Sequence, residues 1–335
     1  MILLLETLHP DAHALLAQRG EVVLAEVAAE ALRAAQSGNV QGILTRGKGK
    51  ITRELMQACG PSLKVVSRCG AGLDTVDTAA AKELGIRVIY APGLNAQTTA
   101  EHTLMLMLAA GRRLATLNNA VKAGNWAIRN DYEGIELNGK TLGIIGLGNI
   151  GQRVAQLGAA FGMKVVYWNR SRVGLAGSES LEGSEGSKVR RLNLANFTNL
   201  QNFPNLSDLL RTADVVSLHV ALNGKTKGMI GTAQLALMKP TAILVNTARG
   251  GLIDQQALAQ ALALGKLGAF GGDVLDGQPP DPNDPLLKQE RAILTPHVGG
   301  LTDTTYREVC LYCAKNVQDV IDGKEPDGNS VYIGS

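Results

Sequence analysis

Arg249 and His297 are the side chains of this sequence best suited to act on a small carbonyl acid. Arg249 closely follows the apolar run 242–246, and His297 follows the apolar run 292–295. Runs of this length are typical of buried strands, and active sites of open α/β sheets lie at the carboxyl ends of their strands. A guanidinium fork can bind a 2-oxo carboxylate with two hydrogen bonds, and an imidazole can donate a proton near neutral pH. We therefore expect Arg249 to bind the carboxylate and carbonyl and His297 to donate the proton when the carbonyl is reduced.

A glycine-rich turn indicates where the hydride donor binds. Its residues are Gly146, Leu147, Gly148, Asn149, Ile150 and Gly151, a G-x-G-x-x-G pattern. The pattern alone is weak, but here it follows an apolar strand at 142–145, opens a helix at 150–161 and precedes a second strand at 165–168. The first glycine permits the tight turn, the second lets the backbone approach a pyrophosphate, and the third lets helix and strand pack closely. We expect a nicotinamide dinucleotide here as the source of the hydride.

The residues after the second strand indicate which dinucleotide binds. An NAD site usually has Asp or Glu there to bond the ribose hydroxyls, whereas this sequence has Asn169-Arg170-Ser171-Arg172. The uncharged Asn169 does not repel a 2′-phosphate, and the two arginines can pair with it. Ser171 can donate a further hydrogen bond. We therefore favour NADP(H), with NAD(H) as the alternative if both arginines point to solvent.

Composition excludes several classes of protein. The 335 residues include 39 Gly but only 11 Pro, which indicates a folded protein with tight turns rather than a disordered or collagen-like chain. With a net charge of +3, 4% aromatic residues and no basic block, we expect no nucleic-acid partner. No apolar run reaches the roughly 18 residues of a membrane span. Four cysteines do not make a disulfide framework. We therefore expect a cytoplasmic protein without a membrane partner.

Short β-rich runs alternate with helical stretches along most of the chain. Strands are expected at 2–5, 22–24, 42–45, 63–67 and 87–90, and then at 141–145, 164–169, 214–218, 242–246, 268–273 and 292–295. Such alternation predicts an α/β fold with parallel sheets, and the length fits two domains. A long, mostly apolar helix is expected from about 95 to 123 and should be buried, and an amphipathic helix is expected at 303–321.

One segment fits neither block. Residues 174–188 are rich in Gly, Ser and Glu, which is typical of a flexible loop. From 193 to 206, Asn recurs at every third position and is followed each time by Leu or Phe. A period of three suits neither an α-helix nor a strand. We expect an insert at about 171–204 that is either an expanded loop or an interaction arm.

With these residues, the chain resembles the D-isomer-specific 2-hydroxyacid dehydrogenases, apart from about 170–204. The motifs that carry the resemblance are LKVVSRCGAGLD at 63–74, APGLN at 91–95, AEH at 100–102, GKTLG at 139–143 before the glycine-rich turn, NTARG at 246–250, GDV at 272–274 and TPH at 295–297. So many motifs in one order make the resemblance specific.

The resemblance implies a discontinuous architecture. A Rossmann cofactor domain at 98–297 would be inserted in a flavodoxin-like substrate domain of 1–97 plus 298–335. Both would be doubly wound parallel sheets, and a homodimer would form through the cofactor domains. No metal ion is expected. Beyond the glycine-rich turn and residues 169–172, the implied cofactor contacts are Thr99, His219, Val220, Ala221, Thr226, Thr247, Ala248, Asp273 and Gly299. Asp273 matches the family residue that bonds the nicotinamide carboxamide.

One position departs from the family at the proposed acid. The family has Glu directly before Pro in the segment after Asp273, and this sequence has Gln278. A Glu carboxylate stabilises an imidazolium, whereas Gln orients the ring without supplying charge. We therefore expect His297 to be protonated over a lower pH range. Formate dehydrogenases of the superfamily carry a Gln–His pair, and their reaction needs no proton transfer. The alternatives are a dehydrogenase with a weakened acid, a weakly active variant, or altered chemistry of the formate-dehydrogenase type.

Two loops of the first domain bear on the substrate. Backbone N–H groups of the Gly70-Ala71-Gly72 loop can hold the carboxylate of a small 2-oxo or 2-hydroxy acid. Arg46, at the end of an expected strand, can hold a second anionic group such as a phosphate, or it is a solvated loop charge. Glyoxylate and hydroxypyruvate fit an NADP(H) reductase best. The other class of function is a dinucleotide-binding regulator of the same fold that uses the insert as a partner arm.

Overall fold

The computed structural model describes residues 1–169 and 200–333, which form two compact units. Unit 1 contains residues 1–95 and 301–333, and unit 2 contains the described residues between them. Among the described residues, the chain passes from unit 1 to unit 2 after residue 95 and returns to unit 1 at residue 301.

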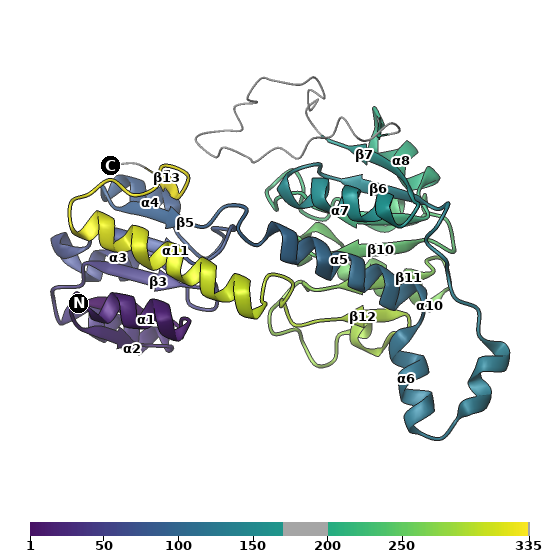
Figure 1. The fold of residues 1–335 in the computed structure, drawn as a ribbon, viewed down its shortest axis with the longest axis horizontal. Helices are drawn as coiled ribbons and strands as arrows, with labels where there is room; N and C mark the ends of the chain where they lie inside the picture. Colours follow the sequence, from purple (N-terminus) through teal and green to yellow (C-terminus); the bar gives the residue numbers. More distant parts are fainter. Residues whose placement is uncertain (170–199, 334–335) are drawn as a thin grey trace. The chain divides into compact units, whose positions relative to one another are not determined.

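Unit 1 is built on a six-stranded sheet in the order β13-β5-β4-β3-β1-β2 (Figure 1). Its strands are β1 (Ile2–Leu4), β2 (Val22–Leu24), β3 (Gly42–Thr45), β4 (Val65–Arg68), β5 (Arg87–Tyr90) and β13 (Val331–Ile333). β1 to β5 are parallel, and β13 runs antiparallel to β5. Its helices are α1 (Pro10–Ala17), α2 (Ala28–Gln36), α3 (Arg53–Ala58), α4 (Thr78–Glu83) and α11 (Asp303–Ile321), with a 3₁₀ turn η1 (Gly60–Ser62).

Helices cover both faces of this sheet. On one face, α1 and α11 pack with Leu4 and Leu44 into one apolar core. On the other face, α2, α3 and α4 pack with Leu3 and Ile43 into a second core. Neighbouring strand residues enter different cores because successive side chains of a strand point to opposite faces. α11, far along the chain, contacts α1 and β4, so the amphipathic helix expected at 303–321 completes the first unit.

Unit 2 is built on a seven-stranded sheet in the order β12-β11-β10-β9-β6-β7-β8, with all of its pairs parallel. Its strands are β6 (Thr141–Ile145), β7 (Lys164–Trp168), β8 (Gln201–Asn202), β9 (Val215–Leu218), β10 (Ile243–Asn246), β11 (Ala269–Gly272) and β12 (Ala292–Leu294). Its helices are α5 (Ala96–Gly111), α6 (Leu114–Lys122), α7 (Asn149–Ala160), α8 (Leu206–Thr212), α9 (Thr232–Leu235) and α10 (Gln255–Ala263), with 3₁₀ turns η2 (Trp126–Asp131), η4 (Gly250–Leu252) and η5 (Pro285–Lys288).

The unit 2 sheet is also covered on both faces. α5 and α7 lie side by side and pack with Val245 of β10, whereas α8, α9 and α10 pack with the preceding residue, Leu244 (Figure 1). A parallel sheet buried on both faces needs apolar residues at nearly every strand position, which is why these strands read as continuous apolar runs. The predicted fold class, two α/β domains with doubly wound parallel sheets, is confirmed.

The long buried helix expected from the sequence is wrong in two respects. It is two helices, α5 and α6, separated at Arg113, whose φ of 49° lies in the left-handed region. The carbonyls of Gly111 and Arg112 accept hydrogen bonds from the Ile135 N–H (2.8 Å) and the Tyr132 hydroxyl (3.1 Å), which takes them out of the helical ladder. α6 contains no buried residue, and with η2 it protrudes from the rest of unit 2 (Figure 1).

Most of the segment expected as an insert, 171–204, lies outside the described residues, as do the first units of the Asn repeat. The described chain resumes at residue 200, where β8 extends the sheet beside β7. The side chain of Asn205 then accepts a hydrogen bond from the Asp208 N–H (2.9 Å) at the start of α8. The last unit of the repeat therefore caps a helix.

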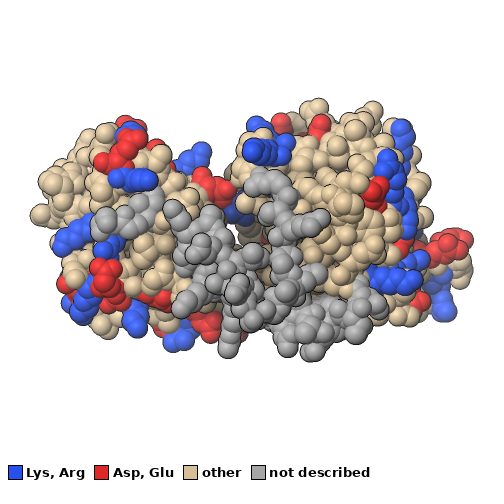
Figure 2. Space-filling model, turned by 90° about the horizontal axis from the view of Figure 1, so that it is seen from above, with Lys and Arg blue, Asp and Glu red and all other residues tan. Residues whose placement is uncertain are grey.

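Charged residues of both signs lie on the surface (Figure 2), and the cysteines lie in the interior. On the face shown in Figure 2, Lys and Arg side chains lie among Asp and Glu side chains on both units. The four cysteines are buried, free thiols. None of the described helices combines the length and apolar character that crossing a membrane requires.

Candidate active site

The strands of the unit 2 sheet all run in one direction, so the residues that follow them gather at one edge of the sheet. The glycine-rich turn follows β6, His219 follows β9, Arg249 follows β10, Asp273 follows β11 and His297 follows β12. Residues that are far apart in the sequence and were assigned to cofactor or catalysis therefore share this edge.

The three glycines of the turn have different neighbours. Gly146 has a φ of +100°, and a Cβ on it would lie 2.7 Å from both the His219 carbonyl oxygen and Val220 Cγ1. A Cβ on Gly151 would lie 2.2 Å from the Gly146 carbonyl oxygen, so α7 packs directly on the turn. A Cβ on Gly148 would meet no atom within 4 Å. The first and third glycines are therefore required by packing within the chain, whereas the second borders open space.

The start of α7 fits a dinucleotide pyrophosphate. The N-cap residue of this helix is Gly148, which has no side chain to cap the first N–H groups. These groups, at Asn149 and Ile150, and the positive end of the helix dipole are available to an anion in the open space beside Gly148. The chain therefore has the backbone donors and the room that a nicotinamide dinucleotide needs.

Asn169 lies beside the turn, at the end of β7. Its side-chain oxygen accepts a hydrogen bond from the Leu147 N–H at 2.7 Å, which ties the turn to the neighbouring strand. An acidic side chain at this place would bond the ribose of NAD. Arg170, Ser171 and Arg172, on which the NADP(H) preference depends, lie outside the described residues.

The segment after β9 is held by internal hydrogen bonds. Nε2 of His219 lies 2.8 Å from Ser217 Oγ, and desolvation of the half-buried imidazole lowers the pKa of His219 to about 3. The ring is therefore neutral at physiological pH. The Thr226 hydroxyl donates to the Ala221 carbonyl (2.7 Å) and accepts from the Asn223 N–H (2.8 Å). The predicted cofactor residues His219, Ala221 and Thr226 thus form one ordered turn.

The loop after β10 presents Arg249. Asn246 is buried, and its side chain donates to the Arg249 carbonyl (2.8 Å) and accepts from the Ala248 N–H (3.0 Å). The Thr247 hydroxyl lies 2.8 Å from the hydroxyl of Thr103 on α5. The Arg249 guanidinium is half-buried and donates to the Ala248 carbonyl (2.6 Å). The strand end and α5 together therefore hold a cation at the edge of the sheet.

His297 and Gln278 are in direct contact. Nδ1 of His297 lies 2.9 Å from Oε1 of Gln278. The Gln278 amide nitrogen donates to the Leu275 carbonyl (3.4 Å), so its oxygen faces the ring and accepts from Nδ1–H. Nε2 is then the ring nitrogen that can exchange a proton with a substrate. His297 itself is held with a φ of 57°, and its N–H donates to the Asp273 carbonyl (2.8 Å).

Asp273 holds the loop that carries the predicted proton donor. Its carboxylate is 2% exposed and accepts hydrogen bonds from the Val298 N–H (2.9 Å), the Gly299 N–H (2.8 Å) and the Thr295 hydroxyl (2.7 Å). Burial alone would raise the pKa of Asp273, but these bonds and His102 lower it to about 2. Asp273 is therefore ionised and anchors the loop, while its contact with a nicotinamide carboxamide stays a prediction.

Sequence reasoning assigned no role to His102 or Thr295, although both stand in the motifs that carry the resemblance. Nε2 of His102 lies 2.9 Å from Thr295 Oγ1 and 3.4 Å from Asp273 Oδ1, which joins α5 to the loop after β12. Thr99, expected to contact the cofactor, is buried one turn earlier on α5, and its carbonyl accepts from the Thr103 hydroxyl (2.7 Å). The AEH motif at 100–102 was the sequence signal for His102. The residue that His102 contacts, Thr295, lies far along the chain and cannot be identified from the motif.

Arg46 in unit 1 is positioned by two neighbours. Its Nε lies 3.4 Å from the Glu6 carboxylate, and its guanidinium carbon lies 5.0 Å from the centre of the Tyr306 ring. Glu6 is 4% exposed, and its Oε1 accepts from the N–H groups of Arg46, Gly47 and Lys48, each at 2.8 Å. Burial alone would raise the pKa of Glu6, but these hydrogen bonds lower it. Arg46 is therefore held in place at the end of β3 by Glu6 and Tyr306.

The glycine loop after β4 lies beside the end of β3. The Gly70 N–H donates to the Arg68 carbonyl (2.8 Å), whereas the N–H groups of Ala71 and Gly72 have no acceptor among the described residues. The Arg68 guanidinium lies over this loop, since a Cβ on Gly70 would be 1.3 Å from its Nη1 and one on Gly47 would be 3.3 Å from its Nη2. Sequence reasoning did not single out Arg68, although it stands two residues before Gly70.

Each sheet edge therefore has a defined chemistry. The edge of unit 2 offers a cation, a titratable ring and a helix start suited to phosphate, which reduction of an anionic carbonyl compound requires. The edge of unit 1 offers two guanidinium groups and two backbone N–H groups suited to an anion. Within residues 1–169 and 200–333, no three His, Cys, Asp or Glu side chains are arranged to hold a metal ion.

Comparison with known proteins places these residues in context. Residues 104–299 match the model of a family described as D-isomer specific 2-hydroxyacid dehydrogenase, NAD binding domain. The chain is 38% identical to the D-3-phosphoglycerate dehydrogenase of Methanocaldococcus jannaschii over 325 residues, which are 96% of this chain and 58% of that protein. It thus spans little more than half of that relative's length.

Two further comparisons cover most of both partners. The chain is 38% identical to the glyoxylate reductase of Aeropyrum pernix over 272 residues, which are 79% of this chain and 76% of that protein. A D-lactate dehydrogenase from Aquifex aeolicus, solved in complex with NAD and lactic acid, has 27% identity and a TM-score of 0.84 over 100% of this chain and 99% of that one.

Proposed function

Because the chain belongs to the D-isomer-specific 2-hydroxyacid dehydrogenase family, we propose that it is an oxidoreductase that reduces a small 2-oxo acid to the D-2-hydroxy acid, reversibly, with a nicotinamide cofactor. The observation that carries the proposal is the hydrogen-bonded pair of His297 and Gln278 at the same sheet edge as Arg249. When bound at the start of α7, the cofactor supplies the hydride.

The side chains divide the remaining work. Arg249 binds the substrate carboxylate and draws electron density from the carbonyl, because a half-buried guanidinium is always charged. Protonated His297 holds a proton on each ring nitrogen. Nδ1–H donates to Gln278, so Nε2–H passes its proton to the carbonyl oxygen as the alcohol forms. In the reverse direction, the neutral ring accepts the hydroxyl proton at Nε2.

Unit 1 supports a proposal about the substrate. Arg46 and Arg68 lie at the ends of neighbouring strands, beside the N–H groups of Ala71 and Gly72. These groups suit the carboxylate of a 2-oxo acid together with a second anionic or polar substituent. The names of the two relatives above include a phosphorylated acid and glyoxylate. Glyoxylate and hydroxypyruvate are our first candidates, and a distal phosphate or carboxylate would bind at the two arginines.

NADP(H) is the cofactor we propose, with NAD(H) as the less favoured one. The support is Asn169, which stands where an acid would repel a 2′-phosphate, followed by Arg170 and Arg172 in the sequence. Arg170→Ala should raise the KM for NADPH far more than the KM for NADH. Equal changes in the two KM values would contradict the preference.

A homodimer formed through unit 2, in the cytoplasm, completes the proposal. Its support is the protruding arm of α6 and η2, on which Leu114, Val121 and Trp126 are 56%, 48% and 66% exposed. Apolar side chains concentrated on one protrusion are typical of a protein–protein contact. Light scattering after size exclusion should show a dimer that Trp126→Ser weakens, and a monomeric wild type would contradict the proposal.

The enzymatic reading is tested by following NADPH consumption with a panel of 2-oxo acids. Wild type should turn over at least one acid, and Arg249→Ala should abolish turnover while retaining NADPH binding. If neither wild type nor Gln278→Glu turns over any acid and both bind NADPH tightly, the result would favour a dinucleotide-binding regulator or a weakly active variant. Formate with NAD⁺ belongs in the panel, because the His297–Gln278 hydrogen bond makes formate oxidation the second candidate.

A further inference from the structure

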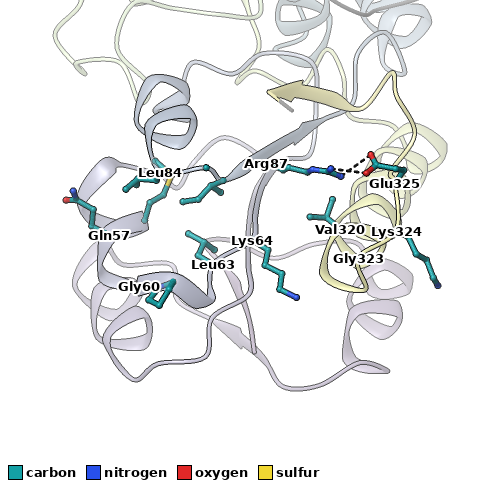
Figure 3. Close-up of a pocket in the computed structure, with 14 residues that line it drawn as sticks. Gln57, Gly60, Leu63, Lys64, Leu84, Arg87, Val320, Gly323, Lys324 and Glu325 are labelled. Carbon is teal, nitrogen blue, oxygen red and sulfur yellow. Dashed lines mark hydrogen bonds and ion pairs between the residues drawn. The ribbon is translucent and has the colours of Figure 1, made fainter. Parts of the chain in front are cut away.

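A cavity of about 630 Å³ opens in unit 1 at the amino ends of β4 and β5 (Figure 3). The ends of α3, α4 and α11 and the residues that precede the two strands line it. Arg68 and Gly70 stand at the opposite, carboxyl end of β4. The cavity is therefore separate from the groups that suit the substrate, and nothing in the proposed reaction uses it.

The floor of the cavity is apolar. Met56, Leu63, Ile86 and Val320 are buried side chains that still line it, and the more exposed Leu84 stands at its rim. Such a floor, drawn from α3, α11 and the residues before β4 and β5, gains stability when an apolar group covers it. It predicts a ligand with a hydrocarbon or aromatic body.

Charged groups stand beside this floor. Arg87 binds the carboxylate of Glu325 through two hydrogen bonds, Nη1 to Oε2 at 3.2 Å and Nη2 to Oε1 at 3.0 Å (Figure 3). The Arg87 side chain is 18% exposed and starts β5, whereas the Glu325 side chain is 83% exposed on the segment after α11. Lys64 adds a second cation, and its Nζ donates to the Ile321 carbonyl (3.0 Å) at the end of α11. Arg87, Lys64 and Glu325 therefore all line the cavity.

The two partners of this ion pair differ in exposure. Arg87 starts β5 and its side chain is largely buried, while the carboxylate that it binds belongs to an exposed side chain. The exposed Glu325 side chain can turn toward solvent, so another carboxylate can take its place on Arg87. The contact between Arg87 and Glu325 therefore shows how Arg87 binds a carboxylate. Within the chain, Glu325 occupies the place that the carboxylate of a ligand would take.

We propose that this cavity binds a small amphipathic carboxylate, with its apolar body on the floor and its carboxylate on Arg87 in place of Glu325. Lys64, beside the floor, adds positive potential. The lining side chain of Lys324 points away from the cavity (Figure 3) and is not needed. The site is independent of the proposed reaction, so it can be tested without an active enzyme.

The experiment is calorimetric titration of the full chain with octanoate, and with 1-octanol as the uncharged probe of matched length. Wild type should bind octanoate and bind octanol more weakly. Arg87→Met should weaken octanoate binding at least about fivefold, because it removes the charged hydrogen bonds. Glu325→Gln should strengthen it about two- to fivefold, because the competing carboxylate is gone. Arg53→Met removes an exposed ion pair with Glu83 outside the cavity and should change nothing.

Three results would overturn the proposal. Equal affinities for octanoate and octanol would show an apolar groove without carboxylate recognition. Octanoate binding that is lost in Arg249→Ala but kept in Arg87→Met would place the probe at the active site. Absence of binding by both wild type and Glu325→Gln would exclude the site. If Arg87→Met fails to fold by circular dichroism, Glu325→Gln decides, since an unchanged affinity there contradicts exchange of the two carboxylates.

Discussion

Replacing Gln278 by Glu tests the proposed role of His297 as the proton donor. Oε1 of Gln278 lies 2.9 Å from Nδ1 of His297, so Glu in the same place sets a carboxylate against the ring. A carboxylate stabilises the imidazolium and keeps it protonated to higher pH. Because the proposed reduction uses the protonated ring, the fall of the reduction rate at alkaline pH should move to higher pH in Gln278→Glu.

The size of the shift follows from the distance and the exposure of the pair. Two unit charges about 4 Å apart interact by about 1 kcal/mol in water and by about 4 kcal/mol near a protein surface. Both side chains are exposed within unit 2, which favours the lower part of that range. Since about 1.4 kcal/mol corresponds to one pH unit, we expect the alkaline limb of kcat/KM to move up by about one unit.

The assay is the pH profile of NADPH-dependent reduction, with Gln289→Glu as the matched control. Gln289 is a partly buried residue after η5 whose side chain donates to the Pro285 carbonyl, so this control adds the same charge without touching the ring. The reasoning is refuted if the alkaline limbs of Gln278→Glu and wild type coincide, or if the control shifts equally. Oxidation of the hydroxy acid, which needs the neutral ring, should lose activity at acidic pH sooner in Gln278→Glu.

The remaining predictions concern the loop anchor and the turn. Asp273→Asn should lower the free energy of unfolding by about 2 kcal/mol at neutral pH, because the pKa of Asp273 is depressed from 3.8 to about 2. That contribution to stability is present above about pH 4 and is lost as the pH falls toward 2. In denaturant unfolding, the difference in the free energy of unfolding between wild type and Asp273→Asn should therefore shrink over this pH range. Gly151→Ala should destabilise the fold by about 1–3 kcal/mol, because its Cβ meets the Gly146 carbonyl. Gly148→Ala should leave the thermal unfolding temperature unchanged and weaken NADPH binding. An unchanged affinity for NADPH would contradict binding of the pyrophosphate beside Gly148.

Local patterns predicted most strands and the glycine-rich turn, but not the edge strands β8 and β13. Most of the predicted strands are buried on both faces, which requires uninterrupted apolar runs that stand out in the sequence. The turn is a contiguous motif, and in the structure Gly146 and Gly151 meet close neighbours while Gly148 borders open space. The long helix shows the limit of such patterns. Its apolar composition continues past Gly111, but tertiary hydrogen bonds from Tyr132 and Ile135 end it.

The candidate site divides in the same way. Positions near strand ends identified Arg249 and His297, and the family resemblance identified Asp273. The partners of these residues come from distant segments, as His102 and Thr295 do for Asp273, and no spacing announces them. In short, the order of residues specifies which chemistry the chain carries and on which strands. Only the tertiary structure decides which loops the buried carboxylates of Glu6 and Asp273 hold. A buried carboxylate needs hydrogen-bond donors, and the folded chain determines which segments supply them.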